Sequence, residues 1–216
     1  MQWDNISDEF RDSLIKEIIE DKMYEKYVQV EEGDIVFDIG ASMGIFTHSI
    51  LPYKPAHVFA IEPSYKEFKT LVLNTRHAQV TCINKAVSDR IGEFESTYIF
   101  DNDEKVYSTT FMQIIKDYNI QKIDFLKTDC EGGEYDIFTP ENLIWIKQNV
   151  RKIVGEWHFD DREEFRAFRD TYLRLFPDHK IYSLDNYDVT WKLWQEEFIH
   201  YYDQVIIHIN NEKAGF

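Results

Sequence analysis

The chain has few cysteines, a shortage of basic residues and no long hydrophobic run. Its 216 residues include only Cys82 and Cys130, too few for a disulfide framework, so we expect free thiols and a reducing, cytoplasmic location. Forty acidic against 24 basic residues give a net charge of −16, which argues against nucleic acid or an acidic membrane surface as a partner. The lack of any apolar run of roughly 20 residues argues against a membrane span, and residues 1–10 carry no signal-peptide pattern.

Short apolar segments, by contrast, are frequent. With 44% hydrophobic and 16% aromatic residues, the chain can bury the core of one α/β domain spanning residues 1–216. Five segments rich in β-formers alternate with helical segments, and this alternation predicts a parallel sheet. The five predicted strands lie at residues 35–39, 57–62, 80–84, 123–129 and 152–158.

Helices and further strands are predicted at both ends of this core. Apolar residues at helical spacing predict an amphipathic helix at residues 5–27, and a charged helix is predicted at 160–176. The segments IYSLD and QVIIHI are expected to form a closing pair of strands at one sheet edge. The predicted parts of the domain are a helical segment at 1–30, a ligand-binding core at 33–158 and a sheet-closing, substrate-side part at 159–216.

The stretch FDIGASMGIF at residues 37–46 joins the first strand to a helix. A dinucleotide fingerprint requires glycines where this turn has Ser42 and Ile45, so a pyrophosphate fits poorly. Asp38 favours a cationic ligand, and Glu62 at the end of the second strand can accept both hydroxyls of a ribose. These features favour a nucleoside site. The turn is similar to the D-x-G-x-x-x-G turn of Rossmann-like methyltransferases that use S-adenosylmethionine.

Several motifs together resemble the FkbM-type methyltransferases over residues 33–158: FDIGASMGIFT, VFAIEPS, INKAVSD, FLKTDCEGGEYDIF and GEWH. The sequence departs from that family at Phe111 and Met112, where a Leu-Asp pair is common. The resemblance implies a Rossmann-like class I methyltransferase fold, with a mostly parallel seven-stranded sheet, helices on both faces and an antiparallel last strand. It also implies methyl transfer from S-adenosylmethionine to a hydroxyl, commonly on a sugar or a natural product.

The turn and the resemblance together assign the cofactor-binding residues. We expect the turn to bind the methionine end of S-adenosylmethionine, with Phe46 as an apolar wall or as part of the core. Ser64, which forms a predicted capping box with Glu67, lies beside the ribose. The resemblance implies that residues 86–87 lie along the adenine, with Asn84 or Ser88 at its edge. The assigned set is Asp38, Gly40, Ser42, Gly44, Phe46, Glu62, Ser64, Ala86, Val87 and Asp129.

Three carboxylates, Asp129, Glu131 and Glu134, follow the fourth predicted strand. They repel one another unless a positive group lies among them. That group is the ammonium and sulfonium of the cofactor, a divalent metal or Lys127. For Glu134 the alternative is an acidic residue at a helix amino terminus, stabilised by the helix dipole.

Glu156 and His158 end the fifth predicted strand on one face, at the edge where open α/β sheets bind ligands. We predict that His158 is the general base for the acceptor hydroxyl, oriented by Glu156 or Glu131. A substrate hydrogen-bond donor, a metal ligand and a structural residue are the alternatives for His158. The set Asp129, Glu131, Glu156 and His158 could instead bind magnesium or manganese, although no short-range ligand motif supports a metal.

Aromatic residues are frequent in and near the carboxy-terminal third, where they stack on sugars, fill the core or form a dimer interface. These are Trp157, Trp191, Trp194, Tyr201 and Tyr202. We predict a monomeric or homodimeric O-methyltransferase that acts on a small-molecule or glycan acceptor, with both cysteines as packing residues. The alternative is a non-catalytic nucleoside-binding or scaffold protein with the same fold, and the missing glycines disfavour a dehydrogenase.

Overall fold

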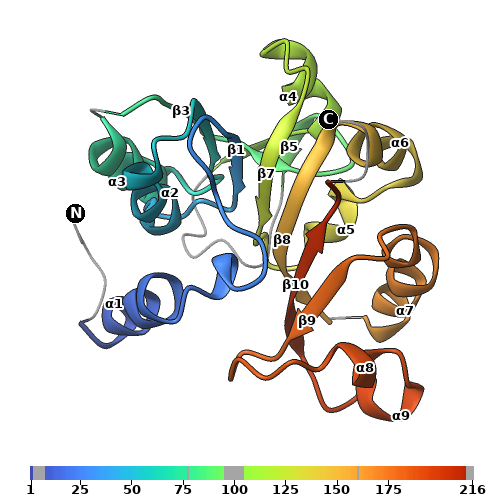
Figure 1. Cartoon of the computed structure of the whole chain (residues 1–216). Helices are drawn as coiled ribbons and strands as arrows, with labels where there is room; N and C mark the ends of the chain where they lie inside the picture. The colour runs from blue at the N-terminus through green and yellow to red at the C-terminus, as the bar shows by residue number, and fades with distance from the viewer. Residues whose placement is uncertain (2–7, 77, 95–104, 160, 213–216) are drawn as a thin grey trace.

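The computed structural model describes residues 1, 8–76, 78–94, 105–159 and 161–212, and a seven-stranded sheet forms its centre (Figure 1). The strand order is β3-β2-β1-β7-β8-β10-β9. The first five strands in this order pair in parallel, and β10 pairs antiparallel with both β8 and β9. The strands are β1 (Ile35–Ile39), β2 (His57–Ile61), β3 (Val80–Ile83), β7 (Ile123–Thr128), β8 (Val150–His158), β9 (His179–Tyr182) and β10 (Gln204–Asn210). The predicted fold class, including the antiparallel last strand, is confirmed.

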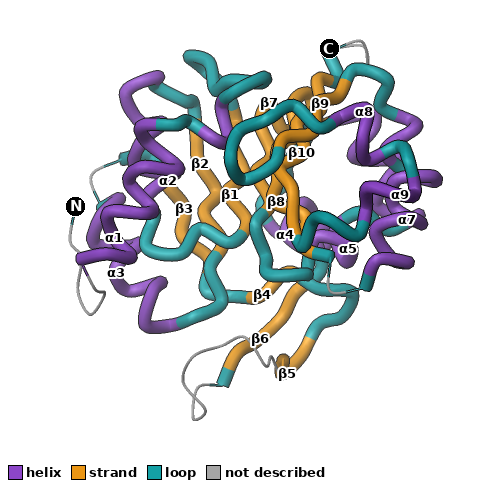
Figure 2. Tube along the Cα trace, turned by 90° about the horizontal axis from the view of Figure 1, so that it is seen from below, coloured by secondary structure: helices purple, strands orange, loops and turns teal. Residues whose placement is uncertain are grey.

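Helices cover both faces of this sheet, with α1, α2 and α3 on one side and α7, α8 and α9 on the other (Figure 2). The helices are α1 (Asp8–Leu14), α2 (Ile45–Ile50), α3 (Tyr65–Thr75), α4 (Phe111–Asp117), α5 (Glu134–Ile137), α6 (Pro140–Asn149), α7 (Arg162–Thr171), α8 (Thr190–Leu193) and α9 (Glu196–Ile199). Four short helical turns are η1 (Ile15–Glu20), η2 (Met23–Glu25), η3 (Leu51–Tyr53) and η4 (Leu173–Leu175). Among the described residues, no helix combines the length and apolar character needed to cross a membrane.

Side chains alternate between the two faces along each strand, and this alternation divides the core into two layers. Val36, Phe125 and Val154 pack on one face with Met23 and Phe46, whereas their strand neighbours Phe37, Leu126 and Ile153 pack on the other face with α4 to α7. The same alternation places Asp38, Lys127, Glu156 and His158 on the face that η2 and α2 cover. The polar strand residues therefore meet at one layer of the fold.

The predicted single helix at 5–27 is wrong in its extent. Within the described residues, helical structure runs from Asp8 to Glu20 and changes from α-helix to a π-helical turn at Ile15. Lys22 then takes a left-handed backbone conformation with φ 50°, which ends any right-handed helix. A separate 3₁₀ turn, η2, follows and buries Met23 and Tyr24 against the sheet.

Two smaller differences concern the segments around the sheet. A second sheet of three short strands was not predicted: β4 (Ala86–Val87), β5 (Gly92–Phe94) and β6 (Val106–Thr109). At α3 the Ser64 hydroxyl accepts the Glu67 N–H at 3.4 Å, as a capping residue does. The Ser64 N–H, however, donates at 2.7 Å to Glu62. Glu62 therefore accepts the hydrogen bond that Glu67 would accept in a capping box. Cys82 and Cys130 are both free, as predicted.

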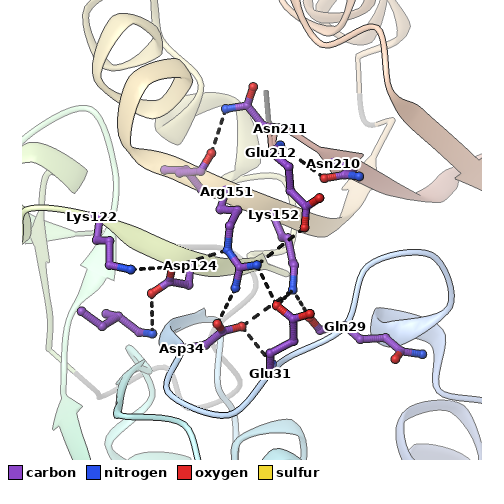
Figure 3. Close-up of polar contacts among 12 residues, drawn as sticks. Gln29, Glu31, Asp34, Lys122, Asp124, Arg151, Lys152, Asn210, Asn211 and Glu212 are labelled. Carbon is purple, nitrogen blue, oxygen red and sulfur yellow. Dashed lines mark hydrogen bonds and ion pairs between the residues drawn. The ribbon is translucent and has the colours of Figure 1, made fainter. Parts of the chain in front are cut away.

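An ion-pair network joins the strands at the edge where β1, β7 and β8 begin (Figure 3). Arg151 lies 2.7 Å from Glu31 and 3.4 Å from Asp124, and it also pairs with Asp34. Lys152 lies 2.7 Å from Glu31. These residues come from the segment before β1 and from the starts of β7 and β8. The network therefore holds these strands in register at the end of the sheet opposite the carboxyl ends of the parallel strands.

Candidate active site

The turn after β1 contains three residues with positive φ, namely Gly40 (76°), Ser42 (48°) and Gly44 (82°). A Cβ added at Gly40 would lie 1.7 Å from the carbonyl oxygen of Asp129, so only glycine fits where the turns after β1 and β7 touch. A Cβ at Gly44 would lie 2.7 Å from Leu71 of α3. The two glycines thus allow close packing on both sides of the turn.

Glu62 follows β2 and lies directly beside this turn. Its two carboxylate oxygens accept the N–H groups of Ser42 at 2.8 Å and of Ser64 at 2.7 Å. Burial raises the pKa of Glu62 to about 8, since only 5% of the residue is exposed. Each oxygen retains a further acceptor position, so the carboxylate can still receive hydroxyl donors from a ligand.

Asp38 and Lys127 form a buried ion pair beneath the turn. The Lys127 ammonium lies 3.0 Å from Asp38 and donates to the Gly40 carbonyl at 2.9 Å. Asp38 also accepts the Thr47 hydroxyl at 2.6 Å. Burial on its own lowers the pKa of Lys127, but the nearby carboxylates of Asp38 and Asp129 outweigh it and raise that pKa. Because Asp38 is fully buried, it acts on the turn through Lys127 and has no surface that a ligand can touch.

The Asp129 carboxylate is held by a residue of the amino-terminal segment, which the sequence did not predict. Tyr24 of η2 donates its hydroxyl to Asp129 Oδ2 at 2.7 Å, and Lys127 lies 3.8 Å from the same oxygen. Burial and the Asp129 carboxylate raise the pKa of Tyr24 well above its ordinary value, so the phenol remains a donor. Tyr24 falls within the predicted amphipathic helix at 5–27, and nothing in that local pattern connects it with Asp129.

Glu134 stabilises the turn that follows Asp129. Its carboxylate accepts the Cys130 N–H at 2.6 Å and the Gly132 N–H at 3.1 Å, and the residue is fully buried. The turn has positive φ at Glu131 (53°) and Gly132 (95°). Glu134 therefore satisfies the backbone of its own turn, while the side chain of Glu131 remains 66% exposed.

His158 lies among three carboxylates at the end of β8. Its Nε2 lies 3.5 Å from Glu131 and 3.7 Å from Glu156, and its Nδ1 lies 3.5 Å from Glu134. Burial alone lowers the pKa of His158, but the surrounding carboxylates, Glu134 first, raise it to about 9. The structure thus brings together the three residues predicted for catalysis and adds Glu134 on the opposite side of the imidazole.

Gln204 is a second residue that the sequence analysis missed. It is the first residue of β10, pairs in register with His158 and donates a hydrogen bond to Glu156. Burial, together with the Asp129 carboxylate, raises the pKa of Glu156 to about 8. Only the antiparallel pairing of the last strand brings Gln204 here, so its signal lies in the topology.

Three of the four residues predicted as a metal set also come together. Ligand atoms of Asp129, Glu131 and His158 all lie within 4.8 Å of one another, and this spacing fits one divalent cation. Glu156, the fourth residue, is not part of that group among the described residues.

The residues predicted to line the adenine lie beyond β3. Ala86 and Val87 form β4 and are buried. Asn84 donates to the carbonyls of Glu62 at 2.8 Å and Pro63 at 2.9 Å, so its amide holds the loop after β2. The Ser88 hydroxyl donates at 3.1 Å to Arg90.

The aromatic residues separate into two groups. Trp157 is fully buried, and its ring stacks at 5.1 Å on Phe168 of α7. Phe46 stacks at 5.9 Å on Phe125, so it is part of the core, the second of its two predicted roles. Trp194 and Tyr202 pack partly buried against the core. Trp191 (57% exposed) and Tyr201 (70% exposed) remain at the surface.

Comparisons with known proteins agree with this arrangement. The family model described as the methyltransferase FkbM domain matches residues 38–184. The curated protein 31-O-demethyl-FK506 methyltransferase FkbM from Streptomyces tacrolimicus is 35% identical over 92 residues, which are 41% of this chain and 35% of that protein. The chain therefore aligns with about a third of the length of this relative.

Two solved structures resemble the fold. An rRNA methylase from Streptococcus thermophilus matches with a TM-score of 0.52 and 7% identity, covering 89% of this chain and 94% of the other. A putative rRNA-methylase from Clostridium thermocellum matches with a TM-score of 0.50 and 12% identity, covering 97% of each chain. At these identities the two structures show a shared fold alone. With the matched domain covering more than half of its residues, the chain belongs to the family of FkbM methyltransferases.

Proposed function

We propose that the protein transfers a methyl group from S-adenosylmethionine to a hydroxyl of a sugar, a glycoconjugate or another natural product. The observation that carries this proposal is the placement of Glu62 and of the carboxylates around His158 at one edge of the sheet. The name of the Streptomyces tacrolimicus relative refers to an O-demethyl compound as the methyl acceptor. That name supports oxygen as the acceptor atom here.

The residues at this edge fit the proposed cofactor in two respects. Glu62 is a buried acceptor directly beside the turn at 40–44, where it can receive the two ribose hydroxyls. The carboxylates of Asp129 and Glu131 give the adjacent region a negative charge that suits an ammonium and a sulfonium. When bound, S-adenosylmethionine supplies an electrophilic methyl group, so the protein needs no covalent intermediate.

The remaining assigned residues have supporting roles in this proposal. Gly40, Ser42 and Gly44 form the turn against which the methionine end lies, and Asp38 supports it through Lys127. Ser64 holds Glu62 through its N–H. The predicted adenine contacts at Ala86 and Val87 are part of the same proposal.

His158 is proposed to remove the proton of the acceptor hydroxyl. In the protein alone its pKa is about 9, so the imidazole is protonated at neutral pH. Glu131, one of the carboxylates that raise this pKa, is proposed to face the cationic cofactor. When Glu131 pairs with a cationic ligand, its effect on His158 weakens and the pKa of His158 falls towards the range of a general base. Nε2, which lies near the more exposed Glu131, is the nitrogen that an acceptor can reach.

Isothermal titration with S-adenosylmethionine and with S-adenosylhomocysteine tests the proposed cofactor. We expect micromolar binding to the unmodified protein, loss of binding in Glu62→Ala and retention in the matched control Glu67→Ala. Glu67 is also an acidic residue near the start of α3 and contributes its backbone N–H to the Ser64 cap. If neither compound binds the unmodified protein, the scaffold function becomes the better explanation. A panel of sugars and natural products with labelled methyl donor then identifies the acceptor.

A further inference from the structure

Tyr24 contacts the candidate site from outside the matched family domain. It lies in η2, whereas the FkbM domain begins at Asp38. Its ring packs edge-on against Phe46 at 5.6 Å and lies 5.1 Å from the Lys127 ammonium. Its hydroxyl reaches Asp129 Oδ2 at 2.7 Å, and the residue is only 2% exposed. A residue of the amino-terminal segment thus completes the surroundings of a carboxylate that belongs to the domain.

The Tyr24 hydroxyl is not needed to attach this segment to the protein. Lys26 donates at 3.0 Å to the Asn186 carbonyl, and Tyr27 donates to Asp178. Lys152 donates at 2.7 Å to the Gln29 carbonyl. Phenylalanine at position 24 would fill the same apolar space, so packing alone does not require a phenol there. The hydroxyl acts specifically on Asp129.

Lys127, like Tyr24, lies close to Asp129 and can donate a hydrogen bond to its carboxylate. It lies 3.8 Å from the oxygen to which Tyr24 donates, and its closer partner is Asp38 at 3.0 Å. The present ion pair between Lys127 and Asp129 is long, and without the phenol the Asp129 carboxylate can rotate closer to Lys127 and form a short, hydrogen-bonded pair. In that arrangement Lys127 would neutralise the charge of Asp129, and a cationic ligand would lose its partner.

We propose that Tyr24 is a positioning residue that prevents the Asp129 carboxylate from closing on Lys127 and keeps it directed to the ammonium of the amino-acid end of the cofactor. This inference rests on the proposed function. It makes the amino-terminal segment part of the cofactor site, with a hydrogen bond that comes from outside the matched residues 38–184. Asp129, whose side chain is 26% exposed, provides the surface that the ligand touches.

Titration of the full chain with S-adenosylhomocysteine tests this role, using Tyr24→Phe, Asp129→Asn and the double variant. We expect Tyr24→Phe to weaken binding about tenfold, the scale of one hydrogen bond to a charged group. The double variant should bind no more weakly than Asp129→Asn, because Tyr24 acts through Asp129. Tyr27→Phe is the matched control, since it removes a phenol hydrogen bond from the same segment but away from the site. It should bind like the unmodified protein.

A rescue experiment separates positioning from packing. A variant with p-aminophenylalanine at position 24 retains an N–H donor of similar reach and should restore most of the lost affinity. Unchanged binding in Tyr24→Phe, or losses that multiply in the double variant, would overturn the inference while the proposed function stands. If the unmodified protein binds no S-adenosylhomocysteine, the proposed function itself fails. Urea unfolding of each variant confirms that the proteins compared are folded.

Discussion

At the scale of single residues, several positions of the site are so closely packed or hydrogen-bonded that no other side chain fits. Gly40 is the clearest case, because its Cα faces the backbone of Asp129. The buried carboxylates are equally constrained. Glu62 and Glu134 each accept two backbone N–H groups, so each fixes the shape of a turn as well as offering a charge. Local folding and the proposed function therefore depend on the same side chains.

Replacement of Gly40 by alanine should prevent cofactor binding and lower the free energy of unfolding by about 3 kcal/mol. The added Cβ would lie 1.7 Å from the Asp129 carbonyl oxygen. Gly33→Ala is the matched control, because Gly33 also has positive φ (86°) but nothing lies within 4 Å of an added Cβ. The control should cost only about 1 kcal/mol of backbone strain. Urea unfolding and titration with S-adenosylhomocysteine measure both effects, and equal losses in the two variants would contradict the steric explanation.

His158→Gln should lower the rate of methyl transfer at least 100-fold without weakening the binding of S-adenosylhomocysteine, because the loss of a positive imidazole does not disfavour the ammonium of the ligand. Glutamine is similar in size but cannot accept a proton from an alcohol. His179→Gln serves as the control, because His179 contacts Phe176 and Trp194, not the site. Single-turnover assays with labelled methyl donor give the rate. Full activity in His158→Gln would rule out the base.

At the scale of elements, the amino-terminal segment packs on one face of the sheet and contacts β10, a strand of that sheet. Gln204 at the start of β10 contacts Glu156, and His208 further along the strand lies 5.4 Å from the Tyr182 ring. His208 is fully buried. Burial lowers its pKa to about 3, although the Met23 backbone opposes this shift and Lys26 adds to it. The face of β10 that the amino-terminal segment covers therefore contains a histidine that is neutral in the folded protein.

This buried histidine predicts a loss of stability in mild acid. The folded-state pKa of His208 lies below its unfolded value near 6.5, so its contribution is complete above pH 6.5 and is lost as the pH falls towards 3. Between pH 7.5 and 5.0 the loss should be about 2 kcal/mol, at 1.4 kcal/mol per pH unit below 6.5. In His208→Gln, the free energy of unfolding measured with urea should differ between these two pH values by about 2 kcal/mol less than in the unmodified protein. An unchanged difference would show that His208 does not titrate in this way.

The sequence predicts the strands well and the segments that cover them less well. Buried strands such as Ile35–Ile39 are continuous apolar runs, so their positions are visible locally. The break at Lys22 depends on a left-handed residue that lysine does not specify. Tyr24 and Gln204 reach the site from segments that lie 105 and 48 residues away from their partners. Such contacts result from tertiary packing and antiparallel pairing, which no local pattern encodes.

At the scale of the whole molecule, the two edges of the sheet have different tasks. The carboxyl ends of the strands hold an excess of carboxylates around His158, whereas at the opposite end Lys122, Arg151 and Lys152 pair with the carboxylates present. There Arg151 compensates Asp34 and Asp124, both almost fully buried. The stability of the sheet and the charge of the site are thereby separated in space, and each should respond to substitution without the other.

Arg151→Met should lower the free energy of unfolding by about 3 kcal/mol, because two buried carboxylates lose their shared partner and keep only Lys122, at 2.9 Å from Asp124, and Lys152, at 3.9 Å from Asp34. Binding of S-adenosylhomocysteine to the folded variant should change less than twofold. The control Arg174→Met removes an exposed pair with Asp170 at 3.3 Å and should cost less than about 1 kcal/mol. Urea unfolding and titration measure both quantities. A large loss of affinity in Arg151→Met would mean that the two edges are coupled.

The position of β10 between β8 and β9 has a consequence for synthesis on the ribosome. Until β10 has emerged, β9 has no neighbour in the sheet and β8 presents an unpaired edge with apolar side chains on both faces. Unpaired apolar edges promote association between chains. A nascent chain, or a product truncated before Gln204, should therefore depend on chaperones far more than the finished protein.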